Sequence, residues 1–124
     1  MLPRVSSFHN VWGEIAIWIN GLIGLWGVVM YRARSVPRVF YWGVGAAICS
    51  MLLQVVVGVV VMEVDDVAPG QQHVFYGVVI AATFAFAYIY RAQLRKRPSL
   101  YLGLLLLFTM GLGIRGIMTY GLDF

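Results

Sequence analysis

The sequence predicts an all-α fold: a four-transmembrane-helix antiparallel bundle with both termini on the outer face of the membrane. The first observation is composition, because 61% of the 124 residues are hydrophobic and only 11% are charged. Soluble domains carry about 25% charged residues, so most of this surface must face lipid. The second observation is that four long apolar runs alternate with short polar connections. We therefore expect residues 1–124 to form a single membrane domain.

Each apolar run is close to the length of about 20 residues that a bilayer core requires. We expect the spans at residues 11–31, 39–62, 73–90 and 99–120. The second run contains QVVVGVVVM, and β-branched residues favour strands in water. Lipid offers the backbone no hydrogen-bond partners, so a helix is expected there instead. The apolar segment that follows MLPRVSSFH is too long for a signal-peptide core, so we expect residue 1 to belong to the mature chain.

The charges in the connections predict the orientation. Seven of the nine basic residues lie in two connections, residues 32–38 and 91–98. The connection between the second and third spans, EVDDVAPGQQ, is acidic and has no basic residue. Because cytoplasmic loops are enriched in Lys and Arg, we expect loops 32–38 and 91–98 to be cytoplasmic. Both termini and the acidic loop then face outward.

Small residues at helical spacing are expected to form the contacts between spans, because lipid gives helices no hydrophobic reason to associate. The glycines at these positions are Gly21, Gly24, Gly43, Gly58, Gly77, Gly103, Gly111, Gly113 and Gly116. The run GLGIRG matches G-x-G-x-x-G, but it lies within a span and follows no strand. We therefore do not interpret it as a dinucleotide-binding motif.

Five side chains are candidates for a polar pocket near the outer face: Glu14, Gln54, His73, Tyr76 and Arg115. A charge inside a membrane is costly and normally has a partner or a function. Counted from the outer span ends at the helical rise, Glu14 and Arg115 both lie about 7 Å deep, and Gln54 about 12 Å. We expect Glu14 and Arg115 to pair across the first and fourth spans. The pair either fixes helix register or belongs to a pocket for a quinone head, a proton or a small ligand.

Two histidines, His9 and His73, mark the outer ends of the first and third spans. Histidines at one depth on different spans can be the axial ligands of haem b, so these two are the candidate haem ligands. The alternative for His73 is an interfacial residue that bonds a helix end or a loop. No metal site is expected, because a third good ligand at useful spacing is missing.

Three short runs carry a resemblance: HVFYG (73–77), YRAQLR (90–95) and MGLGIR (110–115). With these runs the chain resembles a group of small bacterial four-span membrane proteins of unassigned function. That resemblance implies the bacterial plasma membrane and supplies no activity. The chain is also similar to the haem-bearing four-helix anchors of respiratory enzymes, from which it departs because it has no histidine deep within a span.

These observations favour a non-catalytic accessory or anchor subunit of a membrane complex of the respiratory type. The alternatives are a haem b electron-transfer protein that uses His9 and His73, and a small oligomeric transporter or channel that uses Glu14 and Arg115. The expected partners are the lipid bilayer and either other membrane subunits or further copies of the chain, and not nucleic acid. The sequence shows no nucleophile elbow, P-loop or paired carboxylates within a span, so no catalytic residue is assigned.

Overall fold

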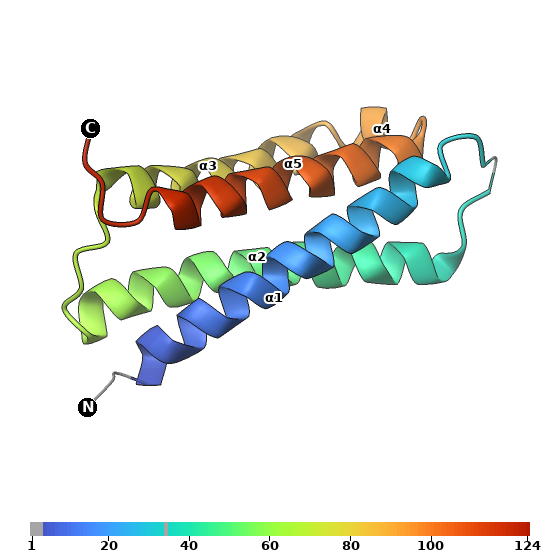
Figure 1. Ribbon diagram of the computed structural model, residues 1–124. Helices are drawn as coiled ribbons and strands as arrows, with labels where there is room; N and C mark the ends of the chain where they lie inside the picture. Colours follow the sequence, from blue (N-terminus) through green and yellow to red (C-terminus); the bar gives the residue numbers. More distant parts are fainter. Residues whose placement is uncertain (1–3, 34) are drawn as a thin grey trace.

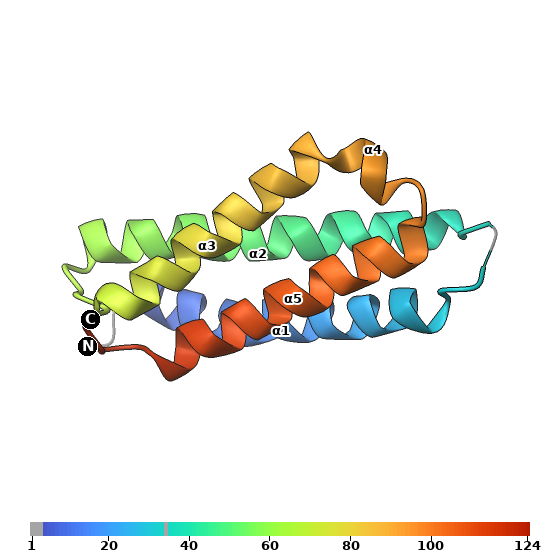
Figure 2. The same cartoon turned by 90° about the horizontal axis from the view of Figure 1, so that it is seen from above.

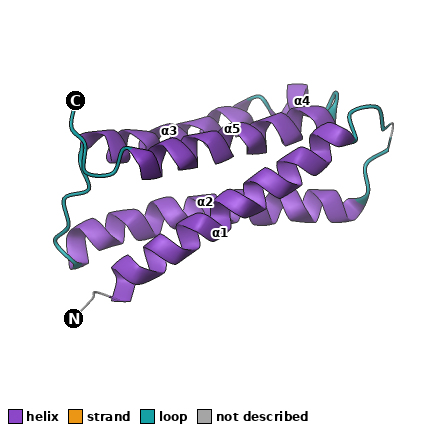
Figure 3. Ribbon diagram, viewed as in Figure 1, coloured by secondary structure: helices purple, strands orange, loops and turns teal. Residues whose placement is uncertain are grey.

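The computed structural model describes residues 4–33 and 35–124, and these residues form helices and loops with no strand (Figures 1 and 3). The helices are α1 (Arg4–Val29), α2 (Arg38–Val64), α3 (Gln71–Ile89), α4 (Arg91–Leu94) and α5 (Pro98–Met118). The predicted all-α four-helix bundle is confirmed. Arg34, which belongs to the first predicted basic loop, and residues 1–3 lie outside the described residues.

Four of these helices, α1, α2, α3 and α5, are long and apolar enough to cross a membrane, so the chain is a small multi-pass membrane protein. The bounds of α2, α3 and α5 lie within two residues of the ends of the predicted spans 39–62, 73–90 and 99–120. Helix α1 begins at Arg4, before the predicted span that starts at residue 11, because a helix can keep its backbone hydrogen bonds beyond the hydrocarbon. The short α4 in the second basic loop was not predicted. The start of α1, the C-terminus and the acidic loop lie at one end of the bundle, called here the acidic-loop end (Figure 1).

Helix α1 packs against α2 on one side and α5 on the other, and α3 packs mainly on α5 (Figures 1 and 2). Helices α2 and α3 have a smaller contact with each other. Helix α1 runs obliquely, so that it meets α5 at the basic-loop end and diverges from it toward the acidic-loop end (Figure 1).

Glycines create the close crossing of α1 and α5. A Cβ atom on Gly103 would lie 2.7 Å from the carbonyl oxygen of Gly24 and 2.7 Å from the amide nitrogen of Val28. A Cβ atom on Gly27 would lie 2.6 Å from the carbonyl oxygen of Ser99. The two backbones are thus in direct contact, as expected for small residues that hold helices together in lipid.

A buried polar cluster joins three helices at mid-bundle. The side-chain amide of Asn20, which is fully buried, donates to the carbonyl oxygens of Ala16 (2.8 Å) and Ala47 (3.1 Å). The Thr109 hydroxyl donates to Asn20 Oδ1 at 2.9 Å. These bonds satisfy the amide and tie α1 to α2 and α5. The sequence points to Asn20 as a polar residue within a span, but it gives no sign that Thr109 is its partner.

The acidic-loop end is closed by the loop and by the C-terminal tail. The backbone amide of Gly121 donates to the carbonyl of Pro69 (2.6 Å), and that of Gln72 donates to the carbonyl of Leu122 (3.0 Å). Asp123 Oδ1 accepts from the backbone amide of Gln71 at 2.9 Å and so caps the start of α3. The bundle is therefore covered at this end by its own chain.

Candidate functional site

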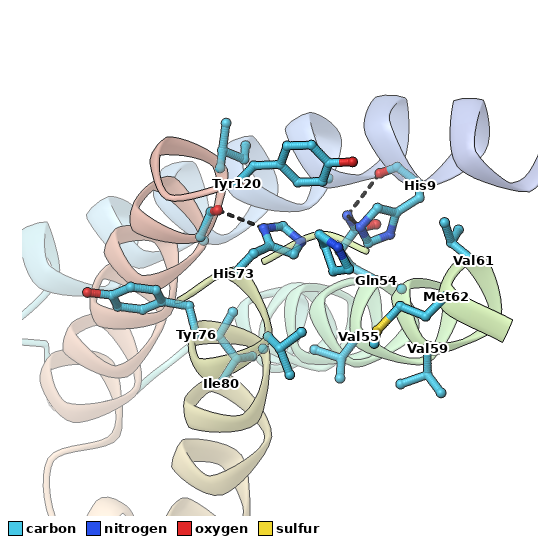
Figure 4. Close-up of a pocket in the computed structure, with 18 of the residues that line it drawn as sticks. His9, Gln54, Val55, Val59, Val61, Met62, His73, Tyr76, Ile80 and Tyr120 are labelled. Atoms are coloured by element: carbon cyan, nitrogen blue, oxygen red, sulfur yellow. Dashed lines mark hydrogen bonds between the residues drawn. The ribbon is translucent and has the colours of Figure 1, made fainter. Parts of the chain in front are cut away.

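A cavity of about 580 Å³ lies between the helices at the acidic-loop end (Figure 4). All four long helices contribute to its lining, and Val67 and Pro69 of the acidic loop border it at the closed end. The size falls within the range of about 300–1,000 Å³ that is typical of small-molecule sites. Most lining side chains are apolar, and the polar ones gather near the closed end. This distribution is that of a ligand pocket with a polar end and an apolar body.

His9 of α1 and Gln54 of α2 form the first part of the polar end. The side-chain amide nitrogen of Gln54 donates to the backbone carbonyl of His9 at 2.8 Å and lies 3.4 Å from His9 Nε2. Two glycines make this contact possible. A Cβ atom on Gly13 would lie 2.7 Å from Gln54 Nε2, and one on Gly58 would lie 3.0 Å from His9 Cε1. The sequence thus leaves space on each helix for the polar side chain of the other.

His73 of α3 completes the polar end. Its Nδ1 lies 2.7 Å from the carbonyl oxygen of Gly116, and because a carbonyl only accepts, Nδ1 carries the proton. Nε2 of a neutral His73 is then a hydrogen-bond acceptor. The ring of Tyr120 packs edge-on against His73 with centroids 5.3 Å apart, and the centroid of the His9 ring lies 6.2 Å from that of His73. In Figure 4 the Tyr120 ring lies above His73, and His9 lies to the right of it.

The polar end holds unused hydrogen-bonding capacity. His9 Nδ1 and Gln54 Oε1 are buried and have no hydrogen-bond partner in the described part of the chain. Buried polar atoms in native proteins are nearly always paired, and an unpaired one costs about 1–3 kcal/mol. The residues that carry both atoms line the cavity.

The body of the cavity is apolar and opens sideways. On one side, Val59 of α2 and Val78 of α3 line the cavity and are 56% and 61% exposed. On the other side, Ile117 of α5 lines it and is 51% exposed. These exposed lining residues place the openings between α2 and α3 and between α1 and α5. Because both gaps lie on the flanks of membrane-spanning helices, the cavity communicates with lipid.

The candidate pocket residues divide into two groups. Gln54, His73 and Tyr76 line the cavity, whereas Glu14 and Arg115 do not. Glu14 and Arg115 are exposed, and within the described residues no ion pair joins them. Arg115 instead donates from Nε to the Tyr76 hydroxyl at 3.4 Å, with its guanidinium carbon 5.9 Å from the centre of that ring. The intramolecular pair expected from the sequence is therefore not formed.

Most of the lining residues were not identified from the sequence, and Tyr120 and Gly77 are two of them. Tyr120 is the last residue of the predicted span 99–120, and the sequence gives no sign that its ring packs against His73 in the cavity. Gly77 was expected to pack against a neighbouring helix. It lines the cavity instead, and no atom lies within 4 Å of the position that its Cβ would take. Only the position of the partner helix distinguishes a packing glycine from one that leaves a cavity open.

Comparison with known proteins gives no family for this chain. No protein-family model matches it, and neither a curated protein nor a solved structure gives a significant match. Within residues 4–33 and 35–124, no group of three or more His, Cys, Asp or Glu side chains could hold a metal ion. The chemistry of the site must therefore be read from the cavity itself.

Proposed function

We propose that this protein is a non-catalytic accessory membrane subunit that binds an amphiphilic molecule with a hydrogen-bonding ring head, of the quinone class, in the cavity at the acidic-loop end. The observation that carries the proposal is the division of one cavity of about 580 Å³ into a polar end, with His9, Gln54 and His73, and an apolar body. A quinone has the same division into a carbonyl-bearing head and an isoprenoid tail.

The polar end of the cavity offers hydrogen-bond partners for the quinone head. A quinone carbonyl only accepts hydrogen bonds, whereas a quinol hydroxyl also donates. His73 Nε2 accepts, and the second proton of the Gln54 amide, which makes only a long contact of 3.4 Å to His9, is available to donate. The site can therefore bond either form of such a head.

The apolar body of the cavity and its lateral openings can accommodate the isoprenoid tail. A tail that leaves the cavity between Val59 and Val78 enters lipid directly, so the ligand need not cross the closed acidic-loop end. Access from within the bilayer suits a molecule that is dissolved there. Among the residues that the structure describes, no Asp, Glu, Lys or Arg side chain lines the cavity, which agrees with a neutral ligand.

An accessory subunit of a membrane complex is the role that such a pocket would suit. In the orientation predicted from the basic loops, the pocket lies in the outer half of a bacterial plasma membrane. A quinone held there would serve a complex of the respiratory type, with this chain as an accessory or anchor subunit. In this role the partner would supply the redox chemistry.

The proposal is tested by titrating decylubiquinone into the protein in lipid nanodiscs by isothermal titration calorimetry. The wild type is expected to bind one quinone per site. His73→Phe keeps the ring and its contact with Tyr120 but removes Nε2, the acceptor for a quinol hydroxyl. In a parallel titration with the reduced form, decylubiquinol, the affinity of this variant should fall up to about tenfold, the effect of one hydrogen bond. A wild type that binds no quinone, or a His73→Phe variant with unchanged affinity for the quinol, contradicts the proposed head site.

A second candidate function is haem b binding, and the positions of His9 and His73 favour it. The two rings come from different helices at one end of a cavity, with centroids 6.2 Å apart. The hydrogen bond from His73 Nδ1 to Gly116 leaves Nε2 as the nitrogen that would bind iron. Haem would supply one-electron transfer. A reduced-minus-oxidised spectrum of the protein from its native membrane should then show a Soret band that both His9→Ala and His73→Ala abolish.

A further inference from the structure

Two opposite charges lie within the spans and are not neutralised inside the bundle. Glu14 of α1 is exposed and forms no hydrogen bond or ion pair within the described part of the chain. Arg115 of α5 is also exposed, and its only partner there is the neutral Tyr76 hydroxyl. Translocon-based scales put the cost of a charge near the bilayer centre at about 2.5–3.5 kcal/mol, so charged residues in spans are normally paired.

The two charges lie at the same level of the membrane. The antiparallel helices α1 and α5 are in register where a Cβ atom on Gly113 would lie 3.0 Å from Ile17 Cγ1. Counting two residues forward from Gly113 and back from Ile17 puts Arg115 beside position 15 of α1. Glu14 is one residue from that position, which is about 1.5 Å along the helix axis.

The two charges also belong to one side of the bundle. Glu14 is followed at helical spacing by Trp18 and Leu25, which are 67% and 54% exposed. Arg115 is preceded at helical spacing by Gly111 and Phe108, and Phe108 is 55% exposed. Helices α1 and α5 lie on the same side of the bundle in two perpendicular views (Figures 1 and 2). We call the outward surface of these two helices the α1/α5 face.

Gly111 adds an independent observation on this face. No atom lies within 4 Å of the position that its Cβ would take, so this glycine packs against nothing within the chain. Other glycines of α5, such as Gly103 and Gly113, touch α1. A glycine on an outward helix face lets a further helix approach closely, which is the usual means of association in lipid.

We propose that the α1/α5 face is the interface of a symmetric homodimer, in which Glu14 of each copy pairs with Arg115 of the other. A two-fold axis along the membrane normal keeps every residue at its own depth, and it brings α1 of one copy against α5 of the second. Glu14 of one copy then lies at the same membrane depth as Arg115 of the other. Each copy contributes one acidic and one basic side chain to the interface. Gly111 allows the approach, and Arg115 keeps its bond to Tyr76 while a second guanidinium nitrogen binds Glu14.

The dimer does not depend on the proposed function. It covers the opening of the cavity beside Ile117 and leaves the opening between Val59 and Val78 in contact with lipid. A second copy is favoured over another protein because this chain itself supplies both complementary charges at the required depth. A different membrane protein would need to present both charges in the same arrangement.

Charge reversal tests the pairing. Glu14→Arg leaves two cations on the face and Arg115→Glu leaves two anions, so each variant alone should be monomeric by native mass spectrometry from nanodiscs under conditions where the wild type is dimeric. A mixture of the two variants should form heterodimers, because both ion pairs are restored between unlike chains. The double variant should again form homodimers. A monomeric wild type, or a mixture that stays monomeric, overturns the proposal.

Cross-linking covers the case in which a charge-reversed chain fails to fold. In a Cys49→Ser background, chains with Glu14→Cys and a first tag are mixed with chains that carry Arg115→Cys and a second tag. Oxidation should give a disulfide that joins the two tags, which can only arise between copies. Chains with Gly45→Cys on the exposed surface of α2 are the control and should not cross-link. Equal cross-linking of the control, or none at Glu14 and Arg115, contradicts the interface.

Discussion

A larger side chain at Gly77 should block the cavity without destabilising the fold. Such a variant therefore tests ligand binding independently of folding. A Cβ atom at Gly77 meets no atom within 4 Å and points into the cavity of about 580 Å³. In Gly77→Leu the Cβ atom therefore meets no neighbour, and the rest of the side chain is expected to extend into the cavity that Gly77 lines. Glycine is less favourable than leucine within a helix by about 0.8 kcal/mol, so the variant should be at least as stable as the wild type.

The expected loss of affinity follows from the volume that the leucine takes. Its four carbon atoms exclude a similar number of carbon atoms of the ligand. Burial is worth about 0.8 kcal/mol per CH₂, so about 3 kcal/mol of binding free energy is lost. Every 1.4 kcal/mol is about tenfold in Kd, which makes the Kd for decylubiquinone about a hundredfold higher.

The assay is calorimetric titration of decylubiquinone into nanodiscs, with Gly45→Leu as the matched control. Gly45 lies on α2, is exposed and also has no atom within 4 Å of its Cβ position, but it does not line the cavity. The control should bind quinone as the wild type does, and all three proteins should unfold at similar temperatures. A folded Gly77→Leu protein with wild-type affinity would refute the cavity as the ligand site, and an equal loss in both variants would show an effect unrelated to it.

Three further predictions concern the bundle itself. Asn20→Ala should lower the free energy of unfolding by about 1–2 kcal/mol in a steric-trapping assay, because Thr109 and two carbonyl groups lose their partner. Gly103→Ala should cost about 1–3 kcal/mol in that assay because its Cβ would press on the backbone of α1, whereas Gly45→Ala should be neutral or stabilising. Asp123→Ala should remove the cap of α3, so hydrogen exchange at the first amides of α3 should become faster while mid-bundle amides are unchanged.

The fold could be predicted from the sequence because the bilayer leaves few choices. Apolar runs of span length must be helical in lipid, and short connections make consecutive helices antiparallel. The largest difference between a predicted span and its helix is at the start of α1, which begins at Arg4 while the predicted span begins at residue 11. Hydropathy detects the hydrocarbon core and not the end of the hydrogen-bonded backbone, so a helix that extends into the headgroup region is cut short.

The sequence predicts how deep the site residues lie in the membrane, but it does not predict which way their side chains point. Gln54 and His73 were predicted near one end, and the structure brings both to one cavity. Glu14 and Arg115 were predicted at a similar depth, but their side chains lie outside the cavity and do not meet. Counting along a helix gives depth at about 1.5 Å per residue, whereas the direction of a side chain depends on where the neighbouring helices lie.

Glycine shows most clearly why this distinction matters for function. Gly103 and Gly77 both stand at helical spacing in apolar spans, so periodicity assigns them the same role. In the structure Gly103 brings α5 into backbone contact with α1, whereas Gly77 leaves open space between α2 and α3. The tight crossing at the basic-loop end and the cavity at the acidic-loop end are therefore linked, because the oblique α1 that meets α5 at one end diverges from it at the other. Changes at Gly103 should consequently alter the cavity that Gly77 leaves open, although the two residues share no contact.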